Sequence, residues 1–523
     1  MKTGNPKLAA TVLISGVSMV ISYLINLLIT PYITEKLGIE AYGFVSIAKT
    51  AVSYASIATV ALTSFIVRFI SVSYHAGDME KARGYYASSV AASVGLLGIL
   101  MTLMILAVTQ LEYILNIPEN LVGSVKLLFV IVFLNFGLTT ISTPLGAVFY
   151  IKNRLDILGV VKIVAYIAEA VVLLCIFSMM PPSIWFVGVG SLTATLVILL
   201  YSGRMTRKLT PELRFRKESV SGGKIKTIMG NGIWNSLNSL GNTLNSGLDL
   251  LISNLFLTAE ATGQIAVVKI IHTMFASLYQ VIFQPLQPRL IQVYAQDDTS
   301  RFVMELKKSM KICGCVAALA FAGFFALGKL YYHLWLPEEN ALLLYQLTIV
   351  VIAISITEGI MQPVYFVNTL TLKNKIPCWV TIGSGIGNVV VTYFLLRYTD
   401  LGAFAVVGTT TVVMLCINLF FNPMYAAKCL GIRQGALYGT LCKHFLATGA
   451  IVGALWWMNR LLNPQTWIGF FASVLPMSVV GVAIYIVLVS NKAERQELWK
   501  KGMQLLCRTK VSKADNGVDK EME

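Results

Sequence analysis

Hydrophobic residues form long runs along the whole chain, and short polar segments separate one run from the next. Each run has about 18 residues or more, enough for an α-helix to cross a hydrocarbon layer of ~30 Å. The pattern therefore predicts fourteen membrane-spanning helices. Their expected ranges are 8–34, 42–70, 84–109, 122–150, 156–178, 184–202, 228–256, 262–288, 309–331, 342–371, 377–396, 402–422, 440–459 and 467–490.

Four of these helices carry a line of polar side chains at steps of three and four, which keeps the residues on one helical face. Unpaired polar groups among lipid tails cost several kcal/mol, so the lines indicate a hydrated central cavity. Hydrogen bonding between helices is the alternative interpretation. The lines are Asn231, Asn235, Asn238, Asn242, Asn245 and Asp249 in the seventh helix; Thr11, Ser15, Ser18, Ser22, Asn26 and Thr30 in the first; Ser46, Lys49, Ser53, Ser56 and Thr63 in the second; Lys269, Thr273, Gln280, Gln284 and Gln287 in the eighth.

The second half of the chain repeats the first half at an offset of 219 to 221 residues. Lys49 matches Lys269, and Pro118 matches Pro337. Six predicted helices separate the two copies, which gives both copies the same orientation in the membrane. We therefore expect two six-helix lobes about an axis along the membrane normal, with a substrate path between them. The expected domains are an N-lobe at 1–203, a basic linker at 204–227, a C-lobe at 228–424, two further helices at 425–491 and a basic tail at 492–523.

Composition and charge agree with a polytopic membrane protein. Only 13% of the 523 residues are charged, whereas a soluble domain has about 25%. Of the 41 Lys and Arg residues, four lie within the predicted spans, four lie on one side and the other 33 share a side with both termini. Basic residues remain cytoplasmic, so both termini are predicted to be cytoplasmic. The net charge of +16 reflects this bias and is not a sign of nucleic-acid binding.

Charged residues within the spans are functional candidates, because each costs roughly 2.5–3.5 kcal/mol to insert at midplane. Lys49 and Lys269 hold the same repeat position and suggest an anionic ligand such as a phosphate, which Lys binds as a point charge. Snorkelling of either lysine to the surface is the alternative. The candidate carboxylates are Asp249, Glu169 and Glu358, for which proton coupling and a salt bridge to a cavity lysine both stay open.

The sequence gives no pattern that indicates catalysis, a cofactor or a metal. Cys313 and Cys315 form the only close cysteine pair and have no nearby His partner. The four histidines show no ligand spacing, and no phosphate loop or nucleophile elbow is present. We therefore expect a protein that is not an enzyme, with no cofactor and no metal.

Together these features resemble the polysaccharide-repeat flippases, the Wzx-like O-antigen transporters of the multidrug/oligosaccharidyl-lipid/polysaccharide (MOP) superfamily. The resemblance rests on the two lobes, the two extra helices, the basic cavity and a cytoplasmic Arg-to-Asp element in each copy. It implies a V-shaped cavity and a cytoplasmic gate formed by Arg68, Asp78, Arg289 and Asp298. The residues expected to bind the substrate are Lys49, Lys269, Asn231, Asn235, Asn238, Asn242, Asn245, Ser22, Asn26, Gln280 and Gln284.

The resemblance also implies a function. The protein would move an undecaprenyl-pyrophosphate-linked oligosaccharide across the bacterial cytoplasmic membrane by alternating access, for O-antigen, lipopolysaccharide or capsule synthesis. Its partners would be membrane lipids, a polysaccharide polymerase and the chain-length machinery. A cation-coupled multidrug antiporter of the same superfamily and a membrane-embedded glycan polymerase or acyltransferase are the alternatives. Few arginines lie within the spans, which argues against a peptidoglycan precursor as the substrate.

Overall fold

The computed structural model describes residues 6–152, 154–294, 296, 298–371, 373–491 and 494–496. Within these residues every regular element is a helix and no strand occurs. Thirteen of the described helical segments are long and apolar enough to cross a membrane. The predicted all-α polytopic membrane fold is therefore confirmed, while nearly all of the predicted tail at 492–523 lies outside the described residues.

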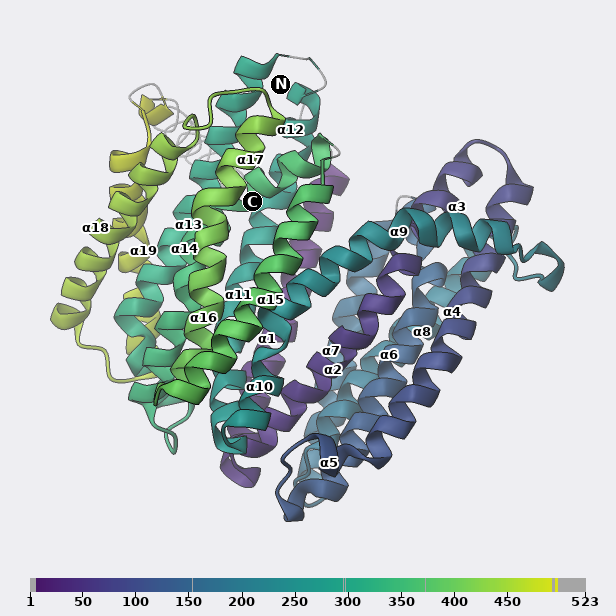
Figure 1. Ribbon diagram of the computed structural model, residues 1–523, viewed down its shortest axis with the longest axis horizontal. Helices are drawn as coiled ribbons and strands as arrows, with labels where there is room; N and C mark the ends of the chain where they lie inside the picture. Colours follow the sequence, from purple (N-terminus) through teal and green to yellow (C-terminus); the bar gives the residue numbers. More distant parts are fainter. Residues whose placement is uncertain are drawn as a thin grey trace, which may run out of the picture. The chain divides into compact units, whose positions relative to one another are not determined.

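The helices follow the predicted spans (Figure 1). The first repeat contains α1 (Pro6–Leu37), α2 (Ile39–Thr63), α3 (Ile66–His75), α4 (Met79–Thr109), α5 (Leu111–Ile114), α6 (Val122–Ile151), α7 (Leu155–Met179) and α8 (Trp185–Leu209). The second contains α9 (Gly222–Asn242), α10 (Asp249–Phe256), α11 (Ala259–Phe283), α12 (Gln287–Tyr294), α13 (Thr299–Trp335), α14 (Ala341–Leu370), α15 (Lys375–Tyr398), α16 (Ala403–Cys416) and α17 (Asn422–Cys429). After the repeats come α18 (Tyr438–Leu462) and α19 (Trp467–Val489).

The predicted span at 228–256 has a composite structure. It consists of α9, a π-helical turn at Thr243–Gly247 and α10. This segment is absent from the thirteen apolar helices found among the described residues. Its asparagines lower the mean hydropathy, although the hydrophobic pattern of the sequence predicted a span at 228–256 together with the other thirteen.

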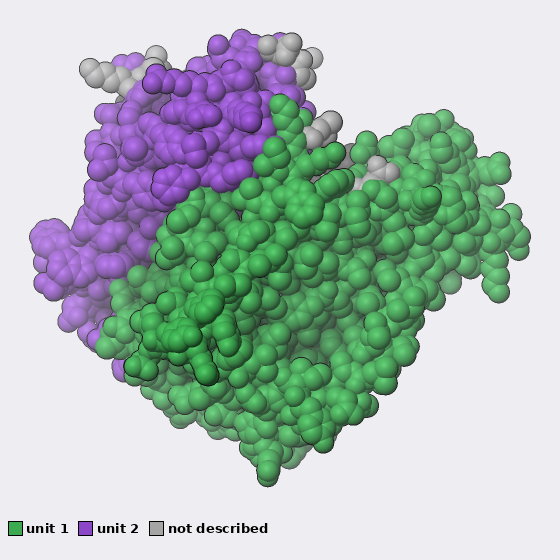
Figure 2. Space-filling model, in the orientation of Figure 1, with its two compact units in different colours: residues 1–281, 335–354, 371–417 green, residues 282–334, 355–370, 418–523 purple. Residues whose placement is uncertain are grey.

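Contacts divide the chain into two compact units (Figure 2). Unit 1 comprises residues 1–281, 335–354 and 371–417, and unit 2 comprises 282–334, 355–370 and 418–523. These units are defined by the contacts between residues, whereas the expected lobes are defined by the internal sequence repeat. The lobes expected from the repeat therefore stay a prediction.

Within unit 1 the helices of the first repeat pack as a bundle. Helix α8 lies against both α6 and α7, α1 lies against α7, and α2 contacts α6 and α9 (Figure 1). At one end of this bundle, Ile66 and Ile70 of α3 are fully buried in a cluster with Tyr85 of α4 and Ala147 of α6. The first candidate site lies among α1, α2, α6, α7 and α8 of this bundle.

Two glycines at the same repeat position touch each other in unit 1. A Cβ atom on Gly43 of α2 would lie 2.9 Å from the backbone nitrogen of Gly263 of α11, and one on Gly263 would collide with the carbonyl oxygen of Ile39. No side chain fits at this backbone approach, which explains glycine at both positions. Because the two residues are repeat-equivalent, their contact marks a point on the expected symmetry axis.

Reciprocal hydrogen bonds join the two repeats at the ends predicted to face outwards. Asn116, after α5, donates its backbone N–H to Oδ1 of Asn254 on α10 at 3.0 Å and its Nδ2–H to the Asn254 carbonyl oxygen at 2.8 Å. Trp335 is 219 residues further along the chain and donates its Nε1–H to the Leu27 carbonyl oxygen of α1 at 2.7 Å. In each case a residue beside the third span of one repeat binds the first span of the other.

Unit 2 contains the two helices that lie outside the repeat. Helices α18 and α19 pack against each other, and His444 of α18 is completely buried. Its Nε2–H donates to the Ile356 carbonyl oxygen at 2.8 Å, which leaves Nδ1 to accept from the Tyr485 hydroxyl at 3.0 Å. A histidine without ligand spacing in the sequence therefore connects α18 with α14 and α19.

Candidate functional site

A cavity of about 280 Å³ lies inside the first repeat. Helices α1, α2, α6, α7 and α8 form its wall, and a second cavity of about 220 Å³ adjoins it along α2, α6 and α8. The larger cavity is lined by Ile25, Asn26, Ile29, Thr30, Ile33, Tyr42, Val45, Lys49, Asn135, Tyr166, Glu169, Val187, Ser191, Ala194, Thr195 and Ile198. Hydroxyl, amide and charged groups are thus gathered inside a bundle that exposes many large hydrophobic side chains.

Lys49 lies on the wall that the two cavities share. Its side chain is exposed, and no carboxylate lies within ion-pair distance among the described residues. The charge of Glu169 on α7 acts on Lys49 across the larger cavity. Glu169 itself accepts a hydrogen bond from the Ser191 hydroxyl of α8 at 3.5 Å. Lys49 is therefore an accessible ammonium group that an anion in the cavity can approach.

Asn135 of α6 also lines both cavities. Its side-chain carbonyl oxygen Oδ1 is buried and has no hydrogen-bond partner in the described part of the chain. A buried acceptor without a partner costs about 1–3 kcal/mol. A hydroxyl-bearing ligand or a water molecule in the cavity would satisfy it.

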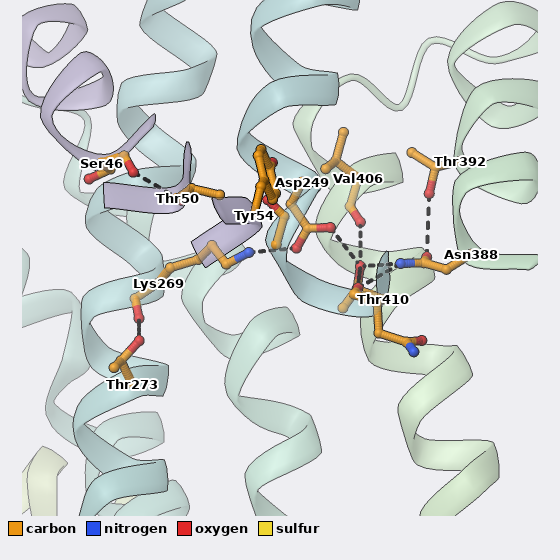
Figure 3. A network of polar contacts seen from close by, with 12 residues as sticks. Ser46, Thr50, Tyr54, Asp249, Lys269, Thr273, Asn388, Thr392, Val406 and Thr410 are labelled. Carbon is orange, nitrogen blue, oxygen red and sulfur yellow. Dashed lines mark hydrogen bonds and ion pairs between the residues drawn. The ribbon is translucent and has the colours of Figure 1, made fainter. Parts of the chain in front are cut away.

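The second repeat holds a closed polar cluster in the corresponding region (Figure 3). The ammonium of Lys269 on α11 lies 2.7 Å from Oδ2 of Asp249 on α10. The Thr410 hydroxyl of α16 lies 3.0 Å from the other carboxylate oxygen of Asp249 and is the donor to it. Asn388 of α15 donates to Thr410 at 3.0 Å and to the Asn245 carbonyl oxygen at 2.7 Å. We call Asn245, Asp249, Lys269, Asn388 and Thr410 the C-cluster.

The π-helical turn explains why this cluster forms next to Asp249. A π-turn opens the backbone and leaves carbonyl oxygens without their usual helical donors. The Tyr54 hydroxyl of α2 donates to the Gly247 carbonyl oxygen at 2.7 Å, and the Asn245 amide donates to the carbonyl oxygens of Gly241 and Thr381 at 2.9 and 2.7 Å. Asn388 of α15 and Thr410 of α16 also donate to the Asn245 carbonyl oxygen of the turn, so side chains from three helices bind its carbonyl oxygens and fix the start of α10.

The repeat relates four residues of the larger cavity to the C-cluster. We call these four residues the N-cluster: Asn26, Lys49, Glu169 and Ser191. Lys49 matches Lys269 and Asn26 matches Asn245 at offsets of 220 and 219. Glu169 matches Asn388. Glu169 accepts a hydrogen bond from the Ser191 hydroxyl on the next helix, and Asn388 donates one to the Thr410 hydroxyl on the next helix. Each cluster thus contains one lysine and one carboxylate. The carboxylate lies on α7 in the first repeat and on α10 in the second.

The line of asparagines divides at the π-turn. Asn235, Asn238 and Asn242 are exposed on α9, whereas Asn245 and Asp249 are buried in the C-cluster. The extra residue in a π-turn rotates the following helix, so residues beyond it leave the face on which the line began. The exposed part remains available to a hydrated cavity, and its role stays a prediction.

The other residues expected to bind the substrate lie apart from the two clusters or are not described. Gln280 on α11 and Gln284 just beyond it are both exposed. The side chains of Ser22 and Asn231 lie outside the described residues. Glu358 on α14 is half-buried in unit 2, so it belongs to a different unit from Glu169 and Asp249.

The residues expected at the cytoplasmic gate have local partners. Asp78 caps α4 by accepting from the Lys81 backbone N–H at 2.9 Å, and Asp298 caps α13 by accepting from the Arg301 N–H at 2.9 Å. A capping carboxylate stabilises a helix start by about 0.5–2 kcal/mol. Arg68 is exposed beside the Phe65 ring, and Arg289 pairs with Glu305 at 3.1 Å. Helix capping accounts for the two aspartates, and the gate stays a prediction.

The structure adds residues to the site that inspection of single helices missed. Asn135, Asn388 and Thr410 were not among the expected site residues. Ser384 and Thr392 flank Asn388 at steps of four, and Thr410 lies within a run of three threonines. The repeat held a usable signal, because the offset of 219 carries Glu169 onto Asn388. Asn135 begins a short polar line of its own, with Thr139 and Ser142 at steps of four and three.

Comparison with known proteins identifies a family to which the chain is similar. Residues 8–294 match the family model described as polysaccharide biosynthesis protein. The uncharacterized membrane protein EpsK of Bacillus subtilis (strain 168) is 26% identical over 494 residues, which is 92% of this chain and 96% of that protein.

Solved transporter structures share the fold. An inward-facing multidrug resistance MATE family transporter of the MOP superfamily superposes with a TM-score of 0.67 at 12% identity, over 80% of this chain and 98% of that one. The lipid II flippase MurJ in an inward closed conformation gives 0.66 at 12% identity, over 91% and 98% of the two chains. At this identity the likeness concerns the fold alone.

Proposed function

The chain belongs to the polysaccharide biosynthesis protein family, and from this membership we propose that it flips a lipid-linked oligosaccharide across the membrane. The lipid is undecaprenyl pyrophosphate, and the glycan is a building unit of a surface polysaccharide such as O-antigen or capsule. The membrane is the bacterial cytoplasmic membrane, and both termini lie in the cytoplasm. A polysaccharide polymerase and its chain-length machinery then take up the product.

The observation that carries this proposal is the cavity of about 280 Å³ with Lys49 on its wall. A membrane protein that moves only apolar molecules has no need of an accessible ammonium group inside a helix bundle, where charge is costly. A pyrophosphate supplies the anion, and the neighbouring amides and hydroxyls, among them Asn26, Asn135 and Ser191, supply partners for a polar headgroup or sugar. The repeat-equivalent Lys269 provides a second ammonium group for the same headgroup.

Reconstitution tests the proposal. Proteoliposomes are loaded with undecaprenyl-pyrophosphate-linked oligosaccharide, and the fraction of glycan accessible to an external glycosidase is followed in time. We expect Lys49→Ala and Lys269→Ala each to lower the initial rate about tenfold, equivalent to ~1.4 kcal/mol, and the double variant to approach the protein-free rate. A folded double variant that flips at the wild-type rate would overturn the proposed role of the lysines.

The carboxylate in each cluster favours a second candidate, a cation-coupled antiporter for cationic drugs. Glu169 lines the cavity and is a suitable partner for a cationic substrate. The same proteoliposomes separate the two functions when a cationic dye replaces the glycolipid. Dye transport driven by a proton or sodium gradient, without movement of the glycolipid, would favour the antiporter.

A further inference from the structure

The ion pair between Lys269 and Asp249 is the most enclosed pair of opposite charges in unit 1 that the structure describes. The Asp249 side chain is 6% exposed and the Lys269 side chain 21%. In Figure 3 Lys269 points at Asp249 from α11, and Thr410 approaches from the opposite side. The carboxylate is therefore confined, while the lysine retains an accessible surface.

The groups that face Asp249 limit what can neutralise it. Among the described residues, Lys269 from α11 is the one cation that faces it, and Tyr54 from α2 is the other titratable group. The Tyr54 hydroxyl is engaged with the Gly247 carbonyl oxygen. Helices α15 and α16 contribute Asn388 and Thr410, which carry no charge. Once Lys269 departs, the described surroundings of Asp249 offer only hydrogen bonds from neutral groups.

The first repeat differs at this point. Lys49 is not held in an ion pair within the described residues, and the position equivalent to Asp249 is Ile29 or Thr30. Lys49 is therefore available to an incoming anion at once, whereas Lys269 must first leave Asp249. A pyrophosphate carries more negative charge than one carboxylate, so it competes for an ammonium group on a flexible four-carbon stem.

We propose that Lys269 exchanges partners during transport, leaving Asp249 for the substrate pyrophosphate while Asp249 takes up a proton from the medium. This exchange rests on the proposed function, because it needs a pyrophosphate-bearing substrate. The balance is simple: one ammonium group moves from carboxylate to phosphate, and one proton binds the vacated carboxylate. Without that proton the exchange would leave a charged and nearly enclosed carboxylate without a cation, which is strongly unfavourable. Substrate binding and proton uptake are thus coupled through one lysine.

The coupling is measurable by calorimetry on the full-length purified protein. Farnesyl pyrophosphate is the probe and farnesol the uncharged control, in sodium-free solutions of two buffers with different heats of ionisation at one pH. The dependence of the binding heat on the buffer gives the number of protons taken up. We expect the wild-type protein to take up nearly one proton more than Asp249→Asn does.

The variants make the test specific. Asp249→Asn should bind the probe about tenfold more tightly, within the range usual for coupled sites, because the carboxylate at 2.7 Å no longer competes for Lys269. Lys269→Gln should bind more weakly and show no additional proton uptake. Glu112→Gln is the matched control, since this carboxylate also pairs with a lysine, Lys126, but lies outside both clusters, and it should behave like the wild type.

Each contrary result has its own meaning. Equal proton uptake by the wild type and Asp249→Asn, or weaker binding by Asp249→Asn, would overturn the exchange and leave the proposed function standing. Binding that depends on sodium instead of pH would overturn the proton as the replacement cation. Failure of the folded wild-type protein to bind the probe in preference to farnesol would overturn the proposed function, and the exchange with it.

Discussion

Removing the ammonium group of Lys269 should destabilise the protein in a pH-dependent way. In Lys269→Met the nearly enclosed Asp249 loses the cation at 2.7 Å and retains the Thr410 hydrogen bond. Breaking a buried ion pair at one partner costs roughly 3–5 kcal/mol. The loss of stability at pH 7 is limited to about 4 kcal/mol, because this is the cost of neutralising an ordinary carboxyl group at that pH. Since Lys269 is 21% exposed, we expect the free energy of unfolding to fall by about 2–4 kcal/mol at pH 7.

The sign of the pH dependence follows from proton binding. In folded Lys269→Met a neutral Asp249 is favoured, so the folded state binds more protons than the unfolded chain, and lowering the pH stabilises it. The loss should shrink by up to about 1.4 kcal/mol for each pH unit between pH 7 and pH 5. Unfolding by denaturant in mixed micelles, followed by tryptophan fluorescence, measures it.

Two controls accompany this measurement. Lys49→Met removes the repeat-equivalent lysine, which has no ion pair within the described residues, and should show a smaller loss with little pH dependence. The double variant Asp249→Asn with Lys269→Met should recover most of the stability, because no charge is then left unpaired. A loss below about 0.5 kcal/mol for Lys269→Met, or one that does not change with pH, would refute the reasoning.

Three further predictions address the other features. Asn238→Leu should abolish glycolipid flipping without lowering the melting temperature if the exposed part of α9 lines a hydrated path; the reverse, normal flipping with a lower melting temperature, would assign Asn238 to helix packing. Gly263→Ala should destabilise the protein by roughly 1–3 kcal/mol through overpacking against Ile39, whereas Gly16→Ala, with no atom within 4 Å of the added Cβ, should not; equal stability of the two variants would contradict the close backbone contact. On a cysteine-free background, an impermeant reagent added outside should label Glu119→Cys and spare Gly222→Cys, and the opposite pattern would reverse the predicted topology.

The sequence determined the fold class because hydrophobic runs and charge bias are local properties. A run of apolar residues must span the bilayer as a helix wherever it occurs, and the observed helices follow the predicted ranges. The segment from α9 to α10 shows where composition alone fails, since its asparagines remove it from the apolar helices. The pattern of hydrophobic runs nevertheless predicted a span at 228–256, and the position of this span in the internal repeat agrees with that prediction.

The repeat also indicated Lys49 and Lys269 as a pair, but their surroundings depended on contacts between distant segments. The π-turn at Thr243–Gly247 separates Asn245 from the exposed asparagines, and a pattern of threes and fours assumes an unbroken helix. Asn388 and Thr410 reach the C-cluster from α15 and α16, more than 130 residues away in the chain. The sequence therefore identified which residues carry charge, whereas the tertiary structure decided that Lys269 is held by a carboxylate and Lys49 faces a cavity. Charge is a property of each residue, but the partner of a charge depends on which helices pack together.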